Sequence, residues 1–229
     1  MTPRRRRILP AVLASIPVLA VLLALGTWQV RRLHWKTELL ATIAAAEAGP
    51  PVPLTAAPQP FTKVSVTGRF RHELEATLGV QVRGTVLGTQ LVTPLEAEGL
   101  PPILVDRGWA PLERGGAAIA RPEGPVTVTG YVSPPHGRDF FAATDDTAGR
   151  RFYTADAPAI GAALGLPGTM PDMLVALRAP DTPRDALPQP AATLPRPSNS
   201  HLGYVITWYG LAASLLGVLI AWIIRKDDA

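Results

Sequence analysis

One histidine of this 229-residue chain lies where it could bind a haem iron. His201 opens an apolar run, and on a helix Tyr204, Val205 and Trp208 would share its face. An imidazole can ligate haem iron, and aromatic rings can pack on the macrocycle. The pattern indicates either a haem site or an ordinary interfacial belt of aromatic residues that includes a polar histidine.

A second group of aromatic and basic residues lies at the end of an earlier apolar run. Trp28 and Gln29 close that run, and Arg31, Arg32 and Trp35 follow. If the two runs are membrane helices joined by one domain, both groups reach the same membrane surface. Guanidinium groups at that surface could pair with haem propionates.

Other kinds of site have little support in the sequence. The absence of cysteine excludes disulfides, zinc knuckles, iron–sulfur clusters and thiol nucleophiles. The four histidines are not spaced as metal ligands, and no nucleophile elbow or glycine-rich phosphate loop occurs. The acidic pair Asp145 and Asp146 is typical of a solvated loop. We therefore expect a protein that is not an enzyme.

Two uncharged runs predict the transmembrane helices that would position these residues. Residues 8–30 and 202–224 are each 23 residues long, which as helices is roughly 35 Å and enough to cross a ~30 Å hydrocarbon core. The first run could instead be a cleaved signal peptide, with Ala24 and Gly26 at the cleavage site. It is longer than the usual signal-peptide core, so we favour an uncleaved anchor, in which Pro17 would introduce a kink.

The basic residues near the spans predict the orientation. Six flank the terminal ends of the spans and four flank the inner ends: Arg4 to Arg7, Arg225 and Lys226 against Arg31, Arg32, Lys36 and Arg196. This excess favours cytoplasmic termini, and we interpret the arginine block as an orientation signal, with no nucleic-acid binding. The short N-terminus and the Arg-, Ala- and Pro-rich composition favour a bacterial plasma (inner) membrane, with the central domain periplasmic or extracellular.

The residues between the spans predict a β-rich domain. Alternation at Val64, Val66 and Gly68 indicates a first strand. The fold class we predict is two transmembrane α-helices flanking a β-rich α+β domain, an antiparallel barrel or sandwich with one or two helices. Further strands are expected within 74–82, 85–93, 103–109, 126–132 and 173–178, a helix within 156–166, and turns at 84, 99–102, 115–116 and 134–135.

The expected organisation has seven segments. They are a basic cytoplasmic N-terminus (1–7), a first span (8–30), a helical extension with a Pro-rich linker (31–60), the β-rich domain (61–178), a second Pro-rich linker (179–200), a second span (201–224) and a cytoplasmic C-terminus (225–229).

Five motifs, in their order and spacing, resemble the Surfeit-locus assembly factors of cytochrome c oxidase, and the resemblance covers nearly the whole chain. They are Leu25-Gly26-Thr27-Trp28-Gln29 with Arg32 and Lys36; Val64, Val66, Gly68 and Phe70; Leu104-Val105-Asp106-Arg107-Gly108-Trp109-Ala110-Pro111; Val126, Val128 and Gly130 before Pro134; and Asn199, His201, Tyr204 and Trp208. One departure is Phe152 beside Tyr153, where the family often has tryptophan.

The resemblance implies a non-enzymatic chaperone that helps insert haem a into the catalytic subunit of the oxidase. It implies transient binding of haem a, with His201 as iron ligand and Tyr204, Trp208, Trp28 and Arg32 around it. The expected partners are the oxidase catalytic subunit, a haem a synthase and the lipid bilayer. The alternative is a scaffold that stabilises oxidase subunits without touching haem, and an enzyme of haem modification is disfavoured.

The central motif allows two interpretations. In the structural one, Asp106 and Arg107 form a local ion pair or turn, Gly108 permits a close backbone approach and Trp109 caps the barrel. In the other, these four residues form a contact surface for a partner.

Overall fold

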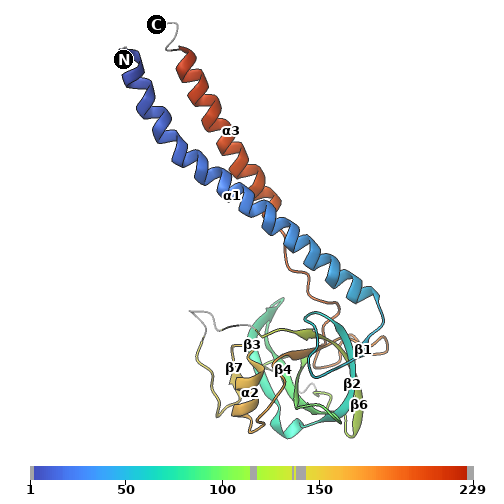
Figure 1. Ribbon diagram of the computed structural model, residues 1–229. Coiled ribbons are helices and arrows are strands. Elements are labelled where there is room, and N and C mark those ends of the chain that lie inside the picture. The colour runs from blue at the N-terminus through green and yellow to red at the C-terminus, as the bar shows by residue number, and fades with distance from the viewer. Residues whose placement is uncertain (1–2, 114–117, 136, 138–142, 226–229) are drawn as a thin grey trace. The chain divides into compact units, whose positions relative to one another are not determined.

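A computed structural model describes residues 3–113, 118–135, 137 and 143–225, with side chains from Leu9 onward (Figure 1). The turn predicted at 115–116 and Lys226 lie outside these residues, and the side chains of Arg4 to Arg7 are not described. The chain forms two compact units, one made of residues 1–42 and 196–229 and the other of residues 43–195. Each unit is described by itself.

Two long helices carry the apolar runs. Helix α1 spans Pro3–Ala48, with Pro10 and Pro17 inside it, and α3 spans His201–Arg225. Both are long and apolar enough to cross a membrane, and only 6% of each apolar window is buried, so neither is the core helix of a soluble domain. The chain is therefore a membrane protein with two candidate spans. The predicted continuation of the first helix beyond residue 30 is confirmed.

Five strands close into a barrel. Strands β2 (Lys63–Phe70), β6 (Pro125–Ser133), β8 (Met173–Ala176), β5 (Ile103–Pro111) and β4 (Val86–Glu96) are neighbours in this order. The end of β4 then pairs with the end of β2, which completes the ring. The barrel is thus the one of our two predicted architectures that the chain adopts.

The barrel is not wholly antiparallel as we predicted, because β5 and β8 run parallel. Parallel neighbours need a long crossover, and here the crossover contains β6, the two-residue strand β7 (Arg151–Phe152) and α2 (Ala157–Ala163). The remaining neighbours in the ring are antiparallel.

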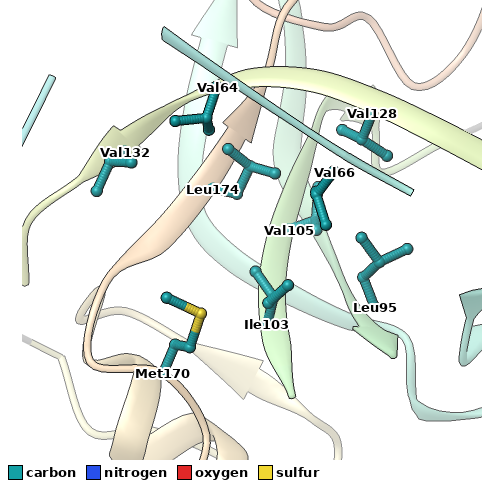
Figure 2. Close-up of a cluster of buried hydrophobic side chains, with 9 residues drawn as sticks. All are labelled: Val64, Val66, Leu95, Ile103, Val105, Val128, Val132, Met170 and Leu174. Carbon is teal, nitrogen blue, oxygen red and sulfur yellow. The ribbon is translucent and has the colours of Figure 1, made fainter. Parts of the chain in front are cut away.

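Nine buried side chains fill the barrel, and all five strands contribute to them (Figure 2). Side chains alternate across a strand, so Ile103 and Val105 point into this cluster while Leu104 points to the opposite face. There Leu104 packs in a second cluster with Ile160 of α2 and with Leu164, which follows the last residue of that helix. Strand β5 is consequently buried on both faces, which explains the apolar residues on either side of Asp106 and Arg107.

The smaller elements extend the sheet and cap its helix. Strand β3 (Ala76–Arg83) pairs with β4 through a turn in which Gly84 has φ +62°. A 3-10 helix, η1, spans His72–Leu74, and the short β1 (Val52–Pro53) and β7 pair in parallel with β2 and β3. Helix α2 begins where the Asp156 carboxylate accepts a hydrogen bond from the Ala159 amide at 3.0 Å. Two-residue strands are too short to give a periodic signal, and neither was predicted.

Much of the two Pro-rich segments, expected as linkers, makes backbone pairings with the β-rich unit. Strand β1 lies in the first segment. In the second, Gln189 bridges to Trp109 and Ala191 bridges to Leu177. The compact unit accordingly reaches residue 195.

Candidate functional site

Helices α1 and α3 pack through one stripe of residues on each. On α3 the less exposed positions include 201, 205, 208 and 212, and on α1 they include 22, 26, 29 and 33. This i, i+4, i+7, i+11 spacing is typical of the seam between two packed helices. A Cβ atom on Gly26 would lie 2.9 Å from the ring of Tyr209, so a larger residue at this position would displace the ring. The Tyr209 hydroxyl also lies 3.1 Å from Thr27 Oγ1.

His201 lies on this seam and is held by Gln29. Its Nδ1 is 2.7 Å from Gln29 Oε1, and the Gln29 side chain is buried. Because an amide oxygen only accepts, Nδ1 carries the proton and donates it, which leaves the lone pair of a neutral imidazole on Nε2. Within the described residues Nε2 has no hydrogen-bond partner. The ring is thus oriented, with one nitrogen available to a ligand.

The other predicted haem-site residues divide between the seam and the outer surface. Trp208 is half-buried on the seam, and its indole Nε1 is buried without a hydrogen-bond partner among the described residues. Tyr204 and Trp28 are 53% and 55% exposed. Arg32 is also exposed, and its guanidinium lies 3.9 Å from the ring centroid of Trp35.

Gln29 is the site residue that sequence reasoning did not assign. The sequence places it beside Trp28 at the end of an uncharged run, but as a neighbour of the candidate site and not as a member of it. Polar side chains within membrane segments are costly unless they face a neighbour and find a partner. This cost indicates that Gln29 faces a polar partner. The identity of that partner, on the other helix, cannot be predicted from the local sequence.

The predicted central motif lies in the β-rich unit, where it forms a β-bulge. The pairing of β5 with β4 shifts between Asp106 and Gly108, so Arg107 is the extra residue. Gly108 has φ +121°, and a Cβ there would lie 2.0 Å from the carbonyl oxygen of Gln189. The close backbone approach that we predicted for Gly108 is therefore present.

We predicted a local ion pair or a turn for Asp106 and Arg107; Arg107 forms its buried ion pair with Glu75 and not with Asp106. Arg107 Nη1 lies 3.3 Å from Glu75 Oε2, and Glu75 Oε1 also accepts from Arg121 at 2.8 Å. The Arg107 guanidinium donates a second hydrogen bond to the Ala120 carbonyl and lies 5.0 Å from the ring centroid of Phe70. Asp106 is instead engaged by the Gly108 amide, which donates to its Oδ1, so the Asp106 carboxylate is held within its own turn.

Asp106 and Trp109 fix the two sides of the bulge. Asp106 Oδ1 accepts from the Gly108 amide at 2.9 Å, and burial raises the pKa of this carboxyl to about 6, against smaller lowering effects of that hydrogen bond and of Arg83. Trp109 donates from Nε1 to the Gln81 carbonyl at 3.2 Å, with the Arg83 guanidinium 5.1 Å from its ring centroid. These contacts are internal to the unit and fit the structural interpretation of the motif.

Comparison with known proteins identifies relatives along most of the chain. Residues 16–213 match the model of a family described as the SURF1 family. The chain is 30% identical to human Surfeit locus protein 1, over 89% of this chain and 73% of that protein. It is 29% identical to Surfeit locus protein 1 of Xenopus tropicalis, over 96% and 77%, and 30% identical to a SURF1-like protein of Monosiga brevicollis, over 91% and 85%.

Proposed function

The chain belongs to the SURF1 family, and we propose that it is a membrane-anchored assembly factor for a haem-copper cytochrome c oxidase. In this proposal it assists the insertion of haem a into the catalytic subunit, acts as a chaperone and catalyses no reaction. Family membership supports the assembly role. The observation that carries the handling of haem is the oriented His201 imidazole, with Nε2 left open.

His201 would bind the haem iron through Nε2. Histidine ligands of metals usually donate their other ring N–H to an oxygen acceptor, which fixes the tautomer and makes the ligand more basic. The 2.7 Å contact with Gln29 Oε1 supplies this arrangement. Haem a is the cargo and not a resident cofactor, so a single imidazole ligand of moderate affinity suits binding followed by release.

Three exposed side chains would hold the rest of the cargo. Trp28 and Tyr204 present aromatic surface on the outer side of the helix pair, where a macrocycle could pack. The exposed Arg32 guanidinium could pair with a propionate. Trp208 has a buried indole N–H without a partner among the described residues, and a bound cargo could supply the acceptor.

The haem proposal is tested by an optical spectrum of the full chain, purified in detergent from cells that make haem a. We expect a haem a band in the parent protein and its loss or shift in His201→Ala. His34→Ala is the matched control, because His34 is an exposed histidine on α1 with no role in the proposal, and it should keep the parent spectrum. Gln29→Leu should shift the band, since the imidazole loses its orienting acceptor.

Two results would overturn haem handling. The parent could take up no haem a while folded, or His201→Ala could bind it unchanged. If His201→Ala lowers the yield of copurified oxidase subunit without any spectral change, the protein is the scaffold that forms our alternative.

The expected partners are the oxidase catalytic subunit and a haem a synthase.

We also propose a bacterial plasma-membrane location with both termini cytoplasmic and the β-rich unit outside. The basic residues around the spans support this orientation. Because the chain has no cysteine, a single introduced thiol reports its side of the membrane. We expect Glu98→Cys, at an exposed position, to react with an impermeant maleimide in intact spheroplasts, and Ala229→Cys to react only after lysis. The reverse pattern would contradict the orientation.

A further inference from the structure

A pocket of about 510 Å³ lies on the outer face of the barrel. Its floor comes from β2 and β6, which are neighbours in the sheet (Figure 1). Lys63 and Thr129 adjoin the inward-pointing Val64 and Val128, so their own side chains point outward into the pocket. The walls come from the last turn of α1, from Pro51 and from two segments after β8: Glu47, Leu177, Arg178, Ala179, Pro180, Ala192, Thr193 and Leu194.

Lys63 places a positive charge in this pocket. Its ammonium donates to the main-chain carbonyls of Glu47 and Gly49 at 3.1 and 3.0 Å. These neutral acceptors hold the side chain in place without cancelling its charge. Within the described part of the β-rich unit no carboxylate forms an ion pair with Lys63, and an ammonium group has a third N–H to donate.

Arg178 adds a second cation with an unmet hydrogen bond. Its Nε is buried and has no acceptor among the described residues. The main chain is fixed here, since the Arg178 amide donates to the Ala191 carbonyl at 2.9 Å. The guanidinium carries further N–H groups, and Arg178 is one of the residues that line the pocket, so it adds a second positive charge there.

The other lining groups define the rest of the ligand. Thr129 and Thr193 bring hydroxyl groups, whereas most of the wall is made of leucine, proline and alanine side chains. Glu47 contributes a carboxylate, one oxygen of which accepts from the Leu194 amide at 3.3 Å. Two cations against one carboxylate leave the pocket net positive. It suits a ligand with an anionic oxygen group on an apolar body.

We propose that the Lys63–Arg178 pocket binds the phosphate of an anionic phospholipid headgroup. An arginine fork and a lysine are the usual partners of phosphate oxygens, and the hydroxyl groups could donate to the remaining oxygens. The chain carries two candidate membrane spans, so the bilayer supplies this ligand at high local concentration. Inorganic phosphate shares the headgroup chemistry but lacks the apolar body. The proposal is independent of haem binding.

The test is a calorimetric titration of the full chain in non-ionic detergent with dihexanoyl phosphatidylglycerol. Dihexanoyl phosphatidylcholine and inorganic phosphate are titrated in parallel. We expect phosphatidylglycerol to bind at least tenfold more tightly than either. Arg178→Gln and Lys63→Gln should each weaken it at least tenfold. Arg184→Gln removes an equal charge from an exposed arginine outside the pocket, and it should bind like the parent.

Each other outcome counts against the proposal. Equal binding of phosphatidylcholine would show that the negative charge is not recognised, and equal binding of inorganic phosphate would make a soluble phosphate compound the ligand. If Arg184→Gln weakens binding as much as Arg178→Gln, only the net charge matters and the pocket is not the site. Arg178→Lys keeps the positive charge at this position. The circular dichroism spectrum of each variant shows whether it is folded, and this separates a loss of binding from a loss of folding.

Discussion

Replacing Gly108 with alanine is expected to lower the free energy of unfolding by about 4 kcal/mol. Alanine at φ +121° is strained, and its Cβ would lie 2.0 Å from the Gln189 carbonyl oxygen. The neighbouring chain cannot move away freely, because Gln189 exchanges two backbone hydrogen bonds with Trp109, at 2.9 and 2.7 Å. The free energy is measured by chemical unfolding of the detergent-solubilised chain, followed by circular dichroism. In thermal unfolding of the same sample the melting temperature should fall by roughly 8–16 °C.

Two control variants separate the causes of this loss. Gly124 has φ +80°, and no atom lies within 4 Å of the position that a Cβ would take, so Gly124→Ala measures the backbone strain alone. Gly68 has an ordinary φ, but its Cβ would lie 2.4 Å from the Glu96 carbonyl oxygen, so Gly68→Ala measures the steric clash alone. We expect Gly108→Ala to exceed both. A Gly108→Ala effect no larger than that of Gly124→Ala would contradict the close contact with Gln189.

The sequence predicts most of the barrel's elements because their signals are local. Alternation at Val64 and Val66 and the apolar run from Ile103 to Val105 mark strands β2 and β5, which the structure confirms. Pairing between distant strands has no local signal. Closure through Phe70 and Leu95, and the parallel pairing of β5 with β8, depend on contacts that the whole fold determines.

The candidate haem site shows the same division at the level of single residues. Successive residues on a helix are about 100° apart, so Tyr204 lies about 60° from His201 around the axis, whereas Val205 and Trp208 lie closer to it. Sequence grouping placed all four on one face, and the packed seam takes His201, Val205 and Trp208 but leaves Tyr204 exposed. Which of these residues is covered depends on where α1 packs against α3, and the sequence pattern of one helix does not contain that information.

The buried carboxyl of Asp106 is expected to make the protein less stable as the pH rises from about 4 to about 6. Burial raises its pKa to about 6 from 3.8, so in this range the folded chain holds a proton that the unfolded chain has released. The free energy of unfolding falls while the folded state binds more protons, and the difference in pKa corresponds to ~3 kcal/mol. This contribution is fully present below pH 3.8 and is lost above pH 6.

Asp106→Asn isolates this effect, because an amide oxygen can still accept from Gly108 but does not titrate. The unfolding free energy of the parent minus that of the variant should fall by ~3 kcal/mol between about pH 3.5 and pH 7 and then stay constant. Asp146→Asn is the opposite control. The Gly149 amide and Arg151 lower the pKa of Asp146, so its carboxylate favours the folded state as pH rises. If the Asp106 difference did not change with pH, the carboxyl would be as well solvated in the folded chain as in the unfolded one, and the tight bulge around Gly108 would have to open to water.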